Sequence, residues 1–149
     1  MKNNILIILL IFYHILFFNK IFANEIEFDA SDIEINDSQN LTIANNGIAK
    51  IKDDGIVVEG IKIKYFKDQS LIVVEQGKIS KIDLNIEITS GKIEYNLKDS
   101  KINFTNKVNI DDKDNNLVIY SDKIDYDVKN QKIFGLGNTE IIDEFDNKY

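Results

Sequence analysis

Several residue types are missing from this chain, and each absence excludes a kind of structure or chemistry. The 149 residues contain no cysteine, no proline and no tryptophan. Without cysteine, neither a disulfide framework nor a thiolate metal site can form. The lack of proline suits long hydrogen-bonded ladders, because proline removes one donor from a β-strand. The composition therefore favours an uninterrupted sheet and argues against a proline-rich linker.

Histidine is almost absent as well. His14 is the only one, and it lies in an apolar N-terminal segment. The rest of the chain therefore has no histidine for acid–base catalysis, a nucleophilic triad or an ordinary zinc site. Carboxylates remain as the candidates for catalysis, and no pair of them stands out. We expect no enzyme activity and no cofactor.

A short acidic stretch, residues 112–116, resembles the start of a calcium loop. Leu117 stands where that loop needs glycine, and Lys123 stands where it needs glutamate. We interpret the stretch as a solvated hairpin turn and predict no metal site.

Positive charge is also scarce. The net charge is −7, and the first 23 residues contain Lys2 and Lys20 but no acid. Without that segment, 16 basic and 25 acidic side chains remain, a net charge of −9. Nucleic-acid binding depends on lysine and arginine neutralising phosphates, so this balance disfavours a nucleic-acid partner.

The N-terminal residues have the features of an export signal. Lys2 precedes an apolar run from Ile5 to Phe18, and Ala23 supplies a small residue for cleavage. We predict a signal peptide over 1–23 and an exported domain over 24–149. An uncleaved anchor is the alternative, although the run is shorter than the roughly 20 residues that span a bilayer.

Four stretches of the exported part carry the same apolar pattern, at spacings of 30, 30 and 31 residues. A fixed period of this size indicates about four small units stacked on one another, each burying its apolar face against its neighbours. The equivalent positions form four apolar columns: Ile26, Ile56, Ile86 and Leu117; Phe28, Val58, Ile88 and Ile119; Ile33, Ile63, Ile93 and Ile124; Ile35, Tyr65, Tyr95 and Tyr126.

Within each unit the apolar residues alternate with polar ones, which is typical of half-buried strands. The charged column Glu34, Lys64, Glu94 and Asp125 is flanked by apolar residues on both sides. One face is therefore expected to be buried and the other wet. A small residue recurs at 30, 60, 90 and 121, where we predict a bend or bulge.

Polar turn signals separate the runs, for example at 36–40, 67–70, 98–100 and 129–131. We predict about three short strand segments per unit, joined by tight turns. Such turns favour antiparallel hairpins, because parallel strands need longer crossovers. The last residues, 147–149, fall where a fifth unit would begin, with Tyr149 in the column of Phe28. We expect a truncated chain or an edge covered by another subunit.

With these features the exported part resembles a known family. An export signal is followed by residues 28–35 and by the segment Leu41–Ile51 with its Asn-Asn-Gly turn, and the pattern returns at 61–65 and 71–79. This is similar to the OstA-like domain of lipopolysaccharide-transport proteins, over about residues 24–149. The family includes the periplasmic bridge protein and the N-terminal domain of the outer-membrane lipopolysaccharide-assembly protein.

The resemblance implies an all-β fold, an antiparallel folded-over sheet or open β-jellyroll. It also implies a periplasmic domain, associated with the outer membrane, that carries lipopolysaccharide or a related lipid along an apolar trough. The sixteen residues of the apolar columns are then the lipid-groove candidates, although an ordinary packed core is the favoured explanation for any one of them. Other jellyroll subunits would join edge to edge by strand addition.

Two alternatives remain from the sequence. A parallel β-helix, as a surface protein or a polysaccharide-active enzyme, also fits a thirty-residue period. A single-anchor inner-membrane component of the same transport bridge would keep residues 5–22 as a membrane helix.

Overall fold

Residues 25–81 and 83–149 are described by a computed structural model, so the predicted signal peptide lies outside the described part. The described residues form one eight-stranded sheet in which each strand pairs with its neighbour in sequence. All seven pairings are antiparallel. The strands are β1 (Ile26–Asn36), β2 (Leu41–Ile51), β3 (Ile56–Phe66), β4 (Leu71–Lys81), β5 (Ile86–Asn96), β6 (Lys101–Asp112), β7 (Leu117–Asp127) and β8 (Lys132–Ile142).

The predicted fold class, an antiparallel folded-over sheet, is confirmed, and the parallel β-helix alternative is wrong as a fold. The prediction of about three short segments per unit is also wrong. Each unit holds two long strands, as β1 and β2 do, and each strand bends once near its middle. One 3-10 turn, η1 (Asp37–Gln39), links β1 to β2, and the described residues contain no α-helix.

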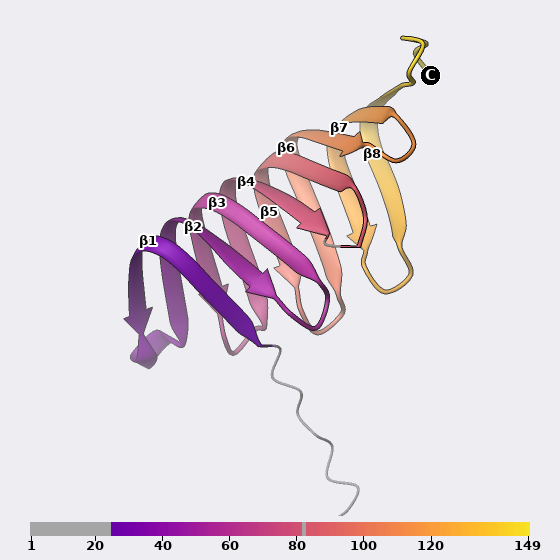
Figure 1. The fold of residues 1–149 in the computed structure, drawn as a ribbon. Coiled ribbons are helices and arrows are strands. Elements are labelled where there is room, and N and C mark those ends of the chain that lie inside the picture. The colour runs from indigo at the N-terminus through magenta and orange to yellow at the C-terminus, as the bar shows by residue number, and fades with distance from the viewer. Residues whose placement is uncertain (1–24, 82) are drawn as a thin grey trace, which may run out of the picture.

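The bend folds the sheet over on itself (Figure 1). Pairing between β1 and β2 breaks after Ala30 and Gly47 and resumes at Asp32 and Asn45. The unpaired Asn46 adopts a left-handed φ of 47°. It shifts the alternation by one residue, so that Thr42 and Ala44 before the bend and Ala49 and Ile51 after it are all buried. The predicted bend near residues 30, 60, 90 and 121 is confirmed.

The left-handed residue returns in every even-numbered strand. Gln76 in β4 has φ 48°, Asn106 in β6 has φ 67°, and Gly137 in β8 has φ 85°. Only glycine adopts this conformation without a steric cost, and asparagine tolerates it better than other residues. Gln76 is therefore the least suited of these residues to its place.

We expect Gln76→Gly to stabilise the protein by about 0.5–1 kcal/mol, because glycine removes the cost of a left-handed Cβ. The free energy of unfolding in urea measures the change. Gln69→Gly is the matched control: Gln69 is exposed in the β3–β4 turn and is not among the residues with positive φ. The control should be neutral or slightly destabilising, and an equal gain from both variants would contradict the assignment of strain to residue 76.

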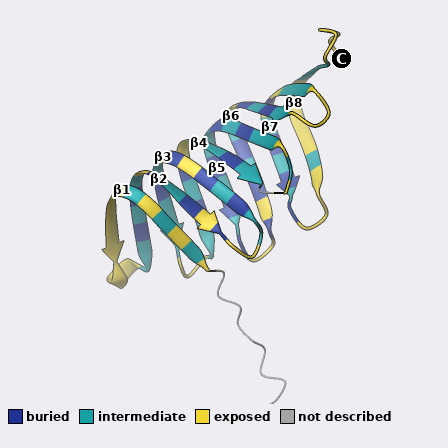
Figure 2. Cartoon of the chain, in the orientation of Figure 1, coloured by how far each residue is buried: buried dark blue, intermediate teal, exposed yellow. Residues whose placement is uncertain are grey.

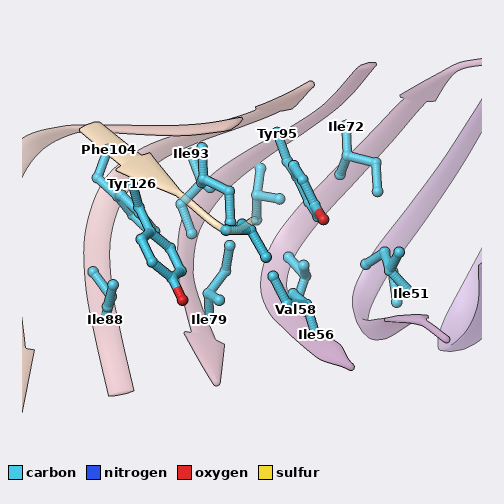
Figure 3. Close-up of a cluster of buried hydrophobic side chains, with 14 of the residues drawn as sticks. Ile51, Ile56, Val58, Ile72, Ile79, Ile88, Ile93, Tyr95, Phe104 and Tyr126 are labelled. Atoms are coloured by element: carbon cyan, nitrogen blue, oxygen red, sulfur yellow. The ribbon is translucent and has the colours of Figure 1, made fainter. Parts of the chain in front are cut away.

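The bend divides the sheet into two arms whose inner faces form the core (Figure 2). The first arm runs to the β2–β3, β4–β5 and β6–β7 turns. The second arm runs to the β1–β2, β3–β4, β5–β6 and β7–β8 turns. Large side chains from both arms interlock between them, among them Tyr95 and Phe104, which have no exposed surface (Figure 3).

Candidate functional site

The inner face of the folded sheet collects all sixteen residues of the apolar columns. The strand register places them there. Phe28 pairs with Ala49 and Ile33 pairs with Ala44, and both alanines are buried in the core. The members that are buried are Ile56, Val58, Ile63, Ile88, Ile93, Tyr95, Ile124 and Tyr126. Those packed partly buried against the core are Ile26, Phe28, Tyr65, Ile86 and Ile119, and Leu117 is half-buried at the end of β7.

Two members of the columns are exposed although they lie on the inner face. Ile33 is 42% exposed and Ile35 is 64% exposed. Both lie in the second half of β1, the first strand of the sheet, with no strand of the described chain beyond it. The apolar interior therefore reaches the surface at the β1 end.

All residues of the columns lie in odd-numbered strands. The even-numbered strands supply at least as many of the buried core residues. Ile72, Val74, Ile102, Phe104 and Ile110 are all buried. Sequence reasoning missed them as site residues, although Ile72 and Val74, and likewise Ile102 and Phe104, alternate with their neighbours at a period of two. Two turn residues of the second arm, Leu97 and Val128, are buried as well. The repeating apolar pattern of the sequence does not include these two positions.

The outer face carries the charged column, as predicted. Lys64 lies opposite Ile43 and Val73, which point away from the core, and its ammonium group is 3.0 Å from a carboxylate oxygen of Glu75. Lys78 lies 3.4 Å from both Glu59 and Glu87. Exposed pairs of this kind contribute little to stability, so the outer face is mainly a solvated surface.

The free ends of the two arms meet along a line that we call the mouth. A surface hollow there is lined by Asp53, Asp54 and Asp83 from turns of the first arm and by Val128 and Lys129 from a turn of the second. At the β1 end the arms also touch through Phe28 and Tyr65, whose ring centroids are 6.4 Å apart. The inner face is thus enclosed by contacts between the arms.

The tyrosines of the fourth column lie near the mouth on the second arm. Tyr95 donates a hydrogen bond to the Asp54 carboxylate across the mouth. Burial and the neighbouring carboxylate raise the pKa of Tyr95. Burial also raises the pKa values of Tyr65 and Tyr126. All three phenols are therefore held neutral, which is the form that packs in an apolar interior.

The two ends of the sheet differ. The edge of β8 is partly covered, because the chain turns back after Ile142 and pairs with it. The Tyr149 amide donates to the Ile141 carbonyl at 3.0 Å, and Lys148 forms an antiparallel bridge with Ile142. Asp143 holds this turn by accepting from the Asn147 amide at 3.0 Å and from the Tyr149 hydroxyl. Strand pairing therefore resumes where the sequence predicted a fifth unit.

The described residues contain no group of three or more histidine, cysteine or acidic side chains placed to hold a metal ion. None of their helical segments has the length and apolar character needed to cross a bilayer.

The fold matches that of a lipopolysaccharide-transport protein. The structure is similar to that of LptH from Pseudomonas aeruginosa, the LptA-homologous periplasmic component of the lipopolysaccharide transport device. The TM-score is 0.66 at 12% identity, over 75% of this chain and 82% of that chain. No family model matches the sequence, and no curated protein matches it significantly. The likeness therefore concerns the fold, and the similar protein is a transport component and not an enzyme.

Proposed function

We propose that this chain is a non-enzymatic periplasmic lipid-transfer domain, and that the inner face of its folded sheet carries lipopolysaccharide or a related lipid toward the outer membrane. The observation that carries the proposal is the apolar interior that opens at the β1 end, where Ile33 and Ile35 are exposed beside a strand edge that no other described strand covers. The similarity of the fold to that of a periplasmic lipopolysaccharide-transport component supports the same proposal.

Acyl chains suit this interior for a simple physical reason. Its lining is almost wholly aliphatic and aromatic, so an acyl chain entering between the arms exchanges water for apolar contacts. The interior is occupied by the protein's own side chains, so lipid entry requires the arms to move apart. Because the arms are joined covalently only at the bend, they can separate without breaking the sheet ladder.

The β1 edge is the proposed joint with another jellyroll subunit. Among the described residues no strand pairs with this edge, so it presents a row of backbone donors and acceptors next to exposed isoleucines, which would make an isolated edge prone to aggregation. Strand addition from a partner would satisfy those groups and join the two apolar interiors. As part of the same proposal, residues 1–23 are the export signal.

Ile35→Asp tests this proposal. We expect the variant to bind lipopolysaccharide about tenfold more weakly, because it replaces an apolar contact at the open end with a charge. The measurement is fluorescence anisotropy of labelled lipopolysaccharide titrated with protein purified from the envelope. Ile61→Asp is the matched control, since Ile61 is 53% exposed at the bend and outside the core.

Both variants should stay folded, because both side chains are largely exposed, and thermal unfolding verifies this. Equal affinities for the two variants and the unaltered protein would contradict a lipid path through the β1 end.

A further inference from the structure

One polar contact spans the mouth from one arm to the other. Asp54 lies in the β2–β3 turn at the tip of the first arm, and Tyr95 is the penultimate residue of β5, near the tip of the second. The two residues are 41 positions apart, and the tyrosine hydroxyl donates to the carboxylate. Because they belong to different arms, this bond links parts of the sheet that the strand ladder does not join.

Tyr95 differs from its equivalents in the same column. Tyr65 packs on the Phe28 ring, and Tyr126 points its hydroxyl in a similar direction to Tyr95 (Figure 3). Within this column, and among the described residues, Tyr95 is the member whose side chain forms a hydrogen bond to the opposite arm. The position that matches Asp54 one unit later is Leu84, which cannot accept such a bond. The contact is therefore specific to the middle of the sheet.

Buried side chains lie beside the contact. Leu97 and Ser100, in the turn that follows Tyr95, are 5% and 3% exposed, and Val128 of the next second-arm turn is 5% exposed. Leu97 and Val128 belong to the core, and Val128 also lines the hollow at the mouth together with Asp54. Opening the arms at this point would expose them together.

The two partners have different surroundings, which makes the bond reversible. Asp54 is only half-buried and lines the surface hollow, so water replaces its partner when the bond breaks. Tyr95 is fully buried, and its ring belongs to the core. A bond to a charged acceptor is stronger than a neutral one, yet here breaking it strands no buried charge.

We propose that the Tyr95–Asp54 bond is a latch that holds the two arms together across the mouth, and that its release opens the interior to acyl chains. The second part of this statement rests on the proposed function. The first part concerns the protein alone and can be tested without lipid.

The test uses single reporter cysteines, which the cysteine-free chain permits. Ser100→Cys reports on the mouth, and Ser90→Cys reports on the bend, where Ser90 is 8% exposed. The rate of thiol labelling is measured for each reporter with and without Tyr95→Phe. We expect Tyr95→Phe to accelerate labelling at position 100 about tenfold, the value for losing a hydrogen bond to a charged group, and at position 90 less than about twofold.

Two further variants separate a latch from general destabilisation. Asp54→Ala changes no core side chain but leaves the buried Tyr95 hydroxyl without its acceptor, so it should accelerate labelling at position 100 at least as much as Tyr95→Phe. The double variant should open no faster than Asp54→Ala. Tyr126→Phe removes a hydroxyl from the same column and should leave both reporters unchanged. Unchanged labelling at position 100 in Tyr95→Phe, or an equal rise at both reporters, overturns the latch.

Lipid uptake then tests the role of the latch. Entry of a pyrene-labelled fatty acid is followed by fluorescence in the same variants. Faster entry into Tyr95→Phe supports the proposed role, and an unchanged rate despite faster labelling at position 100 overturns it. No entry into any variant while the labelling result holds would contradict the proposed function and leave the latch standing.

Discussion

Replacing Ile93 with aspartate is expected to unfold the domain. Ile93 has no exposed surface and lies on the inner face of β5, opposite Val74 and Phe104. The change loses the buried side chain, which costs about 2–5 kcal/mol. It also buries a carboxyl group without a partner, which costs about 2–7 kcal/mol more. The sum is comparable to the whole stability of a domain, about 5–15 kcal/mol.

The measurement is the free energy of unfolding in urea, with circular dichroism as the probe. Ile93→Val is the control, and it should lose only about 0.5–1.5 kcal/mol because it removes one methylene group. A folded Ile93→Asp protein with stability close to the original would show that residue 93 does not face the core.

The second large effect is expected at the bend, where Gly77→Ala should cost about 2–4 kcal/mol through steric overlap. A Cβ at Gly77 would lie 2.6 Å from the Glu59 carbonyl oxygen and 2.6 Å from a Val74 methyl carbon. The first is backbone and the second is a fully buried side chain, so neither moves freely. The close approach of neighbouring strands at the bend leaves no room for a side chain here.

Gly55→Ala is the matched control for this prediction. Gly55 has a φ of 62°, but a Cβ there would meet nothing closer than an Asp83 oxygen at 3.9 Å. Its cost is conformational only, about 1 kcal/mol. Chemical unfolding of both variants gives the comparison, and a Gly77→Ala loss no larger than that of Gly55→Ala would mean that the strands separate easily at the bend.

Much of the fold could be predicted from periodicity. The column of Ile26 supplies the first residue of each odd-numbered strand, and the column of Ile33 lies in the second half of the same strands. The small residues at 30, 60, 90 and 121 mark the bend between the two halves. These features repeat because each unit meets the same neighbours. The number of strands per unit was harder to predict, because a bend inside a strand and a turn between strands both interrupt the alternation.

The candidate site was less accessible to sequence reasoning. The columns identify inward-facing residues, but the exposure of Ile33 and Ile35 depends on β1 being the edge of the sheet. The bond between Tyr95 and Asp54 joins two different units across the fold, so no period within the sequence marks it. Both features depend on how the whole sheet is arranged and folded, which the repeating pattern within one unit does not specify.

Site-specific photocrosslinking in the native envelope tests the central claim most directly. A photoreactive phenylalanine at position 35 or 63 would face the interior, and one at position 34 would face outward on the same strand as position 35. A lipid path along the inner face predicts lipopolysaccharide adducts from 35 and 63 and none from 34. Equal adducts from 34 and 35, or none from 35 and 63 in folded, exported protein, would contradict it.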